Sequence, residues 1–227
     1  MQYTINGSVM QALEIKLDPG ERVFTEKGAM VWMRGDVKMD SNLKGGLFKS
    51  LGRVFAGESL TLNFFEAGRK GGYVGFAPMG PGKVIPLHVA PGKEIICQRD
   101  AFMVAEEGVE LSIYLQKKLG AGFFGGEGFV MQRLSGQGTA FAEIDGEVME
   151  FELASGEEMR VDTSHLALME SSVNMDIEFV KGVKNMFFGG EGLFLTKLQG
   201  PGKVWLQTLT LANLAGRIAE NLPKDDR

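Results

Sequence analysis

The chain has 227 residues, of which 44% are hydrophobic and 23% charged, and its formal net charge at pH 7 is −5. This length fits one large domain or two small ones, and this composition excludes a disordered chain because it supplies enough apolar material for a core. The 32 glycines argue against a bundle of long helices, since glycine inside a helix is destabilising relative to alanine.

The residue types that most often carry chemistry are scarce. The single cysteine, Cys97, excludes an internal disulfide framework, and the two histidines, His88 and His165, leave a metal site poorly supplied. No run of 18 apolar residues occurs, so no membrane span is expected. The first residues resemble neither a signal peptide nor an organelle-import segment. We therefore expect a cytoplasmic protein with no catalytic residues, no metal and no cofactor.

Apolar and polar residues alternate with a period of two along much of the chain, which predicts half-buried strands. Clear examples are residues 13–17, 109–113, 149–153 and 173–179. Pro-Gly, Gly-Pro-Gly and Asp-Gly turns separate these segments at short spacing, as antiparallel neighbours require. The fold class is therefore predicted to be all-β.

Two segments depart from the strand pattern. A short helical turn is expected around residues 47–55, although several glycines lie there. At the C-terminus, Leu211, Leu214, Ile218 and Leu222 recur at helical spacing and Pro223 follows them. This pattern predicts one short amphipathic helix.

The chain also repeats itself. The segment Phe123–Gly128 recurs as Phe187–Gly192, which is 64 residues later, and Val109–Ile113 falls on Val173–Ile177 at the same offset. One constant offset across nearly fifty residues indicates a copied structural unit.

A less regular third copy lies upstream. Pro19-Gly20 matches Pro91-Gly92 at an offset of 72, and Phe55–Glu58 matches Phe124–Glu127 at 69. The next glycine turn matches at only 56, so the first copy is expected to carry 13 extra residues (69 − 56) as a glycine-rich hairpin insertion near 66–72. The predicted units are residues 1–86, 87–146, and 147–227 with the helix.

The stretch at 190–209, Gly-Glu-Gly-Leu-Phe-Leu-Thr-Lys-Leu-Gln-Gly-Pro-Gly-Lys-Val-Trp-Leu-Gln-Thr-Leu, is distinctive. Together with Asp18-Pro-Gly-Glu21 and Gly28-Ala-Met-Val-Trp-Met33, it resembles the family named for altered inheritance of mitochondria. This is a mitochondrial-biogenesis family with many uncharacterised bacterial and archaeal members. The resemblance covers essentially the whole chain and lends no catalytic residues, because none are established for the family.

The resemblance implies three tandem repeats similar to the subunit of the tryptophan RNA-binding attenuation protein, a shortened double-stranded β-helix or β-sandwich unit, in a pseudo-threefold arrangement. In that protein single-repeat subunits close into a ring. Three fused repeats per chain would give a comparable ring as a homotrimer. Eukaryotic members carry an import segment that this chain lacks, so the mitochondrial role does not transfer.

The strongest polar candidates are glutamates that recur once per copy beside a glycine. Each could present a carboxylate to a ligand, or accept hydrogen bonds from the amides of its own turn, and the repeated structural role is favoured. The candidate binding residues are Gly57, Glu58, Gly126, Glu127, Gly190 and Glu191.

Other motifs have a structural interpretation beside the functional one. The pairs Phe123-Phe124 and Phe187-Phe188 favour packing in a core or a subunit interface over a partner-binding rim. Residues 120–125 fit Gly-x-Gly-x-x-Gly. A dinucleotide site needs this motif between a strand and a helix, whereas the flanking segments are predicted to be strands. Basic residues beside Leu47, Phe48 and Leu51 leave a peripheral membrane contact open.

Repeated strand units without a converging acid, base or nucleophile predict a structural or scaffolding oligomer and not an enzyme. The first alternative is a ligand- or RNA-binding module, but the acidic balance argues against RNA and basic residues recur only in part. The partly matched positions are Lys27, Arg99 and Thr163, and Lys83, Thr139 and Lys203. A remote alternative is a cupin-like metal enzyme.

Overall fold

The computed structural model describes residues 1–26, 28–41, 62–117, 128–180 and 193–222. Within these residues the chain consists mostly of strands, two short 3-10 turns and one helix, α1 (Leu211–Glu220). The prediction of an all-β protein with a short C-terminal helix is confirmed. The Thr210 hydroxyl starts α1 by accepting a hydrogen bond from the Asn213 amide at 3.1 Å.

The strands form three antiparallel sheets. The first sheet has the order β1 (Gln2–Asn6), β2 (Ala12–Leu17), β5 (Asn63–Phe76), β3 (Arg22–Thr25), β8 (Phe102–Glu106), β11 (Gly138–Asp145) and β6 (Gly82–Val89), and β4 (Met30–Asp40) also pairs with β5. The second has the order β12 (Val148–Leu153), β17 (Gly202–Gln207), β14 (Leu166–Glu170), β7 (Ile95–Gln98), β10 (Phe129–Gly136) and β9 (Val109–Lys117). The third has the order β13 (Glu158–Asp162), β16 (Leu193–Gln199) and β15 (Asn174–Val180).

One pairing scheme occurs three times along the chain, and we call its copies the first unit (β2–β5), the middle unit (β6–β11) and the last unit (β12–β17). In the last unit, β16 lies between β13 and β15, and β17 lies between β12 and β14. In the middle unit, β10 and β11 have the corresponding neighbours. In the first unit, the single long strand β5 replaces the two central strands of the other units. β2 and β3 pair along one edge of β5, and β4 pairs along the other edge.

A β-bulge recurs at the same place in each unit. The pairing register shifts at Val31 in β4, at Met103 in β8 and at Ala167 in β14. These positions are 72 and 64 residues apart, which are the offsets found in the sequence. Bulges bend and twist the strand that carries them, so the three units share this local geometry as well as the pairing.

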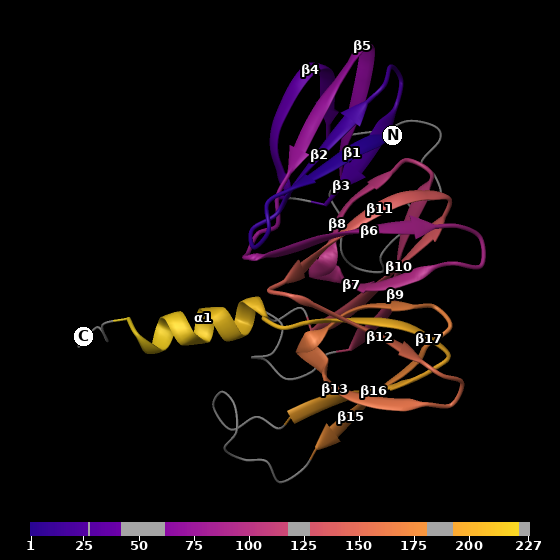
Figure 1. The fold of residues 1–227 in the computed structure, drawn as a ribbon, viewed down its shortest axis with the longest axis vertical. Helices are drawn as coiled ribbons and strands as arrows, with labels where there is room; N and C mark the ends of the chain where they lie inside the picture. Colours follow the sequence, from indigo (N-terminus) through magenta and orange to yellow (C-terminus); the bar gives the residue numbers. More distant parts are fainter. Residues whose placement is uncertain (27, 42–61, 118–127, 181–192, 223–227) are drawn as a thin grey trace.

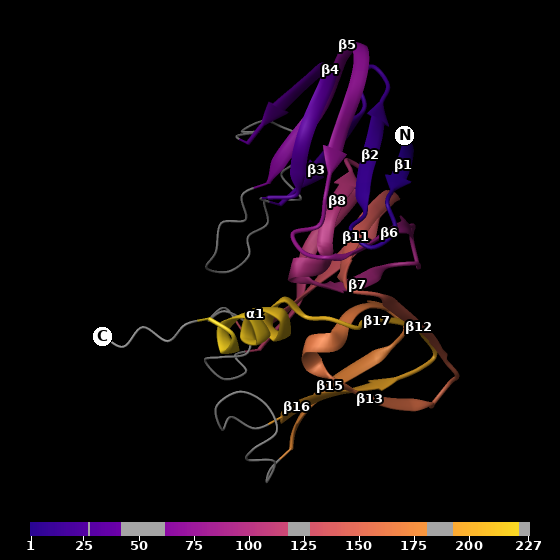
Figure 2. The ribbon, with the colours of Figure 1, turned by 60° about the vertical axis from the view of Figure 1, so that its left-hand side comes forward.

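The units are joined through strand edges. β3 of the first unit pairs with β8 of the middle unit, and β7 of the middle unit pairs with β14 of the last unit. Figure 1 shows the units following one another along the long axis, with α1 projecting sideways, and Figure 2 shows the same order. Among the described residues no strand of the first unit pairs with a strand of the last, so this linear order differs from the predicted pseudo-threefold arrangement within one chain.

Neighbouring units also share their hydrophobic cores. Phe24, from β3, is fully buried in the cluster of the middle unit, where its ring lies 5.7 Å from that of Phe102. Ile96, from β7, is buried in the cluster of the last unit. In the reverse direction, Val104 and Phe141 of the middle unit belong to the core of the first. The chain therefore cannot be cut between units without opening a core.

Two predicted details of the first unit are wrong. Residues 66–72 are not a hairpin tip, because residues 63–76 form the single strand β5. A Cβ atom on Gly72 would stand 2.4 Å from the Val37 side chain and 2.6 Å from the Arg34 carbonyl oxygen. A glycine at this position therefore allows β4 and β5 to approach each other closely. The boundary at 86/87 falls inside β6, which pairs with β11 and so belongs to the middle unit.

Phe24→Ala tests the shared core. Because the ring is buried in the neighbouring unit, we expect its removal to lower the free energy of unfolding by about 3–5 kcal/mol. Chemical denaturation followed by tryptophan fluorescence and circular dichroism should show one coincident transition at lower denaturant. Phe179→Ala, which truncates an exposed ring on β15, is the control and should change stability much less. A cost for Phe24→Ala no greater than that control would refute the shared core.

Candidate functional site

The repeated glutamates and glycines singled out in the sequence cannot be placed. Glu58, Glu127 and Glu191 lie outside the described residues, as do Gly57, Gly126 and Gly190. The two Phe-Phe pairs and the expected helical turn at 47–55 lie outside them as well. Their roles stay predictions.

Other glutamates do accept hydrogen bonds from main-chain amides in a repeated way. Glu21 accepts from the Asp18 amide and Glu157 accepts from the Ala154 amide, both at 2.8 Å. In each turn the preceding glycine, Gly20 or Gly156, has a positive φ. The spacing x-x-Gly-Glu in Asp18–Glu21 and Ala154–Glu157 is a signal that sequence reasoning could have used.

A second repeated contact lies where two strands end. Glu106, the last residue of β8, accepts a hydrogen bond from the Thr139 amide, and Glu170, the last residue of β14, accepts one from the Lys203 amide at 3.0 Å. Both partners are 33 residues downstream, so the contact belongs to the unit. These carboxylates tie adjacent strands of one sheet together.

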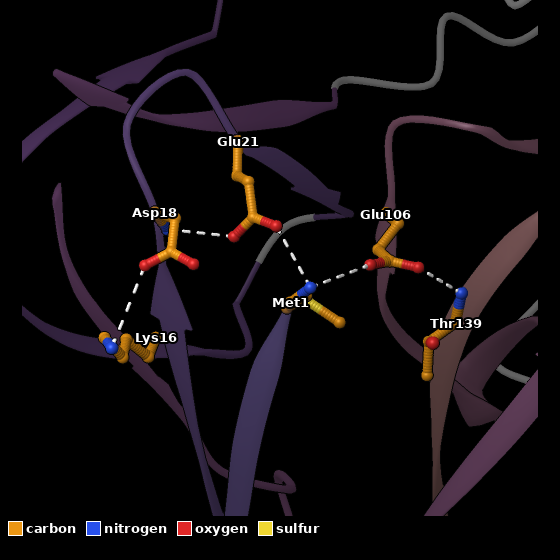
Figure 3. Close-up of polar contacts among 6 residues, drawn as sticks. All are labelled: Met1, Lys16, Asp18, Glu21, Glu106 and Thr139. Carbon is orange, nitrogen blue, oxygen red and sulfur yellow. Dashed lines mark hydrogen bonds and ion pairs between the residues drawn. The ribbon is translucent and has the colours of Figure 1, made fainter. Parts of the chain in front are cut away.

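Figure 3 shows that the contacts of Glu21 and Glu106 are linked in one network across the junction of the first and middle units. The Met1 amino nitrogen lies 3.0 Å from Glu21 and 3.8 Å from Glu106, and Lys16 lies 3.8 Å from Asp18. Burial raises the pKa of Glu21, but the Asp18 amide and the Met1 amine outweigh it and hold the pKa below its ordinary value. The network therefore keeps Glu21 charged and joins two units.

A pocket of about 720 Å³ lies beside this network, between the end of β2 and the paired strands β4 and β5. Its lining includes three cationic residues, Lys16, Arg34 and Lys70, two acidic residues, Asp18 and Asp36, and Tyr73. The Arg34 guanidinium stands 4.4 Å from the centre of the Tyr73 ring. Sequence reasoning missed this pocket because its walls come from three separate segments of the chain.

β4 carries an exposed apolar segment on a strand whose other edge has no partner among the described residues. Val31, Trp32 and Met33 are 62%, 38% and 41% exposed. The corresponding residues of β8 and β14 are fully buried because β3 and β7 cover them. These are Met103, Val104 and Ala105 in β8, and Ala167, Leu168 and Met169 in β14.

The remaining sequence candidates do not come together as a reaction centre. His88 is exposed on β6, and the His165 Nδ1 atom lies 2.6 Å from the Gln207 carbonyl oxygen. Burial, with the Glu26 carboxylate nearby, raises the pKa of the fully buried Cys97 thiol. Among the described residues, no three histidine, cysteine, aspartate or glutamate side chains form a possible metal-binding group.

The cations that partly recur between units are already paired. The Lys83 ammonium lies 3.0 Å from a Glu147 carboxylate oxygen, and Lys203 lies 2.7 Å from Glu150. Arg99 lies 3.9 Å from Glu26, and Lys27 is outside the described residues. Paired lysines are poorly placed to hold a phosphate backbone. In the described part of the chain, no helix has the length and apolarity needed to cross a membrane.

Glu143, on β11, generates a pH-dependence test. Burial, and then the charge of Asp145, raise its pKa to about 8. In the unfolded chain Glu143 ionises near pH 4.5, so its stabilising contribution is complete below that pH and is lost as the pH rises towards 8. Glu143→Gln should therefore stabilise the protein at pH 8 relative to the original chain, by about 2 kcal/mol or more.

Thermal melts at pH 4.5 and pH 8 measure this effect. The control is Glu110→Gln, which changes an exposed carboxylate on β9 and should leave the difference between the two pH values as in the original chain. The assignment is wrong if Glu143→Gln leaves that difference unaltered too.

Three comparisons place the chain among known proteins. The family model for mitochondrial biogenesis AIM24 matches residues 3–209. The chain is 30% identical to the uncharacterised protein M6_Spy0233 of Streptococcus pyogenes serotype M6, over 98% of this chain and 92% of that protein. The crystal structure of protein SPYM3_0169 from Streptococcus pyogenes is similar with a TM-score of 0.78 at 25% identity, covering 97% of this chain and 99% of that one. The chain therefore belongs to the AIM24 mitochondrial-biogenesis family.

Proposed function

We propose that this chain is a non-enzymatic structural or scaffolding protein, built from three attenuation-protein-like repeats, that works as a homotrimer. The observation that carries the proposal is the junction between units. The same strand pairing and core sharing occur at both junctions of the chain. Stacked units of this kind bury their faces against the next unit.

The two ends of the stack support self-association. At one end the edge of β4 has no strand partner among the described residues, and at the other end β13 pairs only with β16 in that same part of the chain. An open edge presents unpaired amides and carbonyls to another strand. An interface between unlike ends generates a ring when its rotation closes.

The polar groups of the described chain also favour a structural role. Four of the recurring carboxylates, Glu21, Glu106, Glu157 and Glu170, accept hydrogen bonds from backbone amides. Such contacts hold turns and strand ends in place. The arrangement therefore supports a scaffold.

Size-exclusion chromatography with multi-angle light scattering tests the proposal at micromolar protein concentration. We expect a mass of three times 24.7 kDa, about 74 kDa. We expect this mass to persist at high salt concentration, because apolar edge residues contribute to the contact. A species of 24.7 kDa at every concentration examined would overturn the proposal.

A further inference from the structure

We propose that the interface between copies is a third version of the junction inside the chain: β13 of one copy pairs antiparallel with β4 of the next, with Val161 opposite Trp32 and Met159 opposite Arg34. This inference rests on the proposed self-association and adds to it the surface and the register. Its occupant is a second copy of this chain.

The register follows from the two junctions that the structure contains. Val23 lies opposite Glu106 and Phe24 opposite Ala105 at the first junction. Ile95 lies opposite Glu170 and Ile96 opposite Met169 at the second. The donor residues are 72 apart and the receiving residues 64 apart, as in the sequence repeat. Continuing the same offsets brings Met159 of β13 opposite Arg34 of β4, and Arg160 opposite Met33.

A backbone hydrogen bond beside each junction repeats in the same way. The Glu107 amide donates to the Arg22 carbonyl oxygen at 3.3 Å, and the Ser171 amide donates to the Glu94 carbonyl oxygen at 3.1 Å. The third version would run from the Gly35 amide of one copy to the Glu158 carbonyl oxygen of the other. Both junctions thus agree on the position at which the paired strands end.

The receiving edge has the surface that such a strand would cover. Val31, Trp32 and Met33 are exposed at the positions where both internal junctions bury their residues completely. The Trp32 indole lies across the backbone of β5, since a Cβ atom on Gly75 would stand 2.3 Å from it. Aromatic residues and methionine are enriched in protein interfaces. The edge of β4 therefore combines exposed apolar side chains with a backbone that has no partner strand among the described residues.

The donor strand differs from the internal donors at one informative position. Arg160 stands where β3 has Phe24 and β7 has Ile96, both fully buried. It is half exposed and lies 3.2 Å from Glu178 and 3.9 Å from Glu158. An arginine at this position keeps the free end solvated, and in the proposed register it would lie opposite Met33, on the same face of the sheet.

The net charges of the two ends favour unlike ends meeting. Residues 1–81 contain ten lysines and arginines against eight acidic residues, whereas residues 147–227 contain eight against thirteen. A contact between two first units or two last units would bring like net charges together. Opposite charge steers the head-to-tail encounter and disfavours the symmetric one.

The contact would also complete the pocket beside Arg34. Gly35 lines this pocket, and the continued register brings Glu158 of the second copy opposite Gly35. The pocket, lined by three cations and by the carboxylates Asp18 and Asp36, would then lie next to Glu158 of the second copy. A space that is open to solvent in one chain becomes a site walled by two.

Register-specific cross-linking tests the proposal. Chains carrying Met33→Cys are mixed with chains carrying Arg160→Cys under mild oxidation, because directly opposed residues of antiparallel strands are close enough for a disulfide. Cys97 is fully buried and does not compete. The matched control mixes Met39→Cys with Arg160→Cys, since Met39 is exposed on the same strand but about 20 Å along it.

We expect a disulfide-linked pair from the Met33→Cys and Arg160→Cys mixture, at least tenfold more than from the control mixture. Rapid linkage of Met33→Cys chains to one another would overturn the proposal in favour of a symmetric contact. An oligomer by light scattering without the expected linkage would overturn the register while leaving self-association standing. A monomer in the same measurement would overturn both.

Discussion

The architecture depends on antiparallel pairing between one strand edge of a unit and the next unit in the chain, in a single register. This pairing brings Phe24 opposite Ala105 and Ile96 opposite Met169, and it carries the side chains of each donor strand into the neighbouring core. A shift by one residue would turn those side chains to the other face of the sheet. The register therefore determines which side chains enter the neighbouring core, and so how the three units are joined.

The polar contacts also repeat from unit to unit. A carboxylate at the end of β8 or β14 accepts a backbone amide of the following paired strand, and a carboxylate after the β2 or β12 turn accepts an amide of that turn. Groups of this kind satisfy backbone donors that turns and strand ends leave free. Their repetition explains why acidic residues recur in this chain without forming a reaction centre among the described residues.

The stack has two unlike ends, and this polarity bears most directly on function. The β4 end is apolar and aromatic beside a pocket lined by three cations and two carboxylates, whereas the β13 end carries Glu158 and Arg160. In a repeat protein that does not associate further, the first and last repeats would both present polar outer faces. Here the exposed Val31, Trp32 and Met33 leave one end incompletely covered, which is the physical reason to expect a second copy there.

The amino-acid sequence by itself determined the all-β class, the C-terminal helix and the offsets at which elements recur. Alternation of period two reports which face of a strand is buried, and a constant offset reports a copied unit. The offset of 64 relates β8 to β14, and the spacing of leucine and isoleucine from Leu211 onward predicted α1.

Only the tertiary structure decided how the units join. The contacts that matter pair residues far apart in the chain, such as Val23 with Glu106, and local patterns carry no information on such pairs. The glycines near residue 70 indicated a turn, yet they lie in β5, where their missing side chains let β4 come close. Exposure of Val31, Trp32 and Met33 is likewise a tertiary fact, because equivalent apolar segments elsewhere in the chain are covered by the preceding unit.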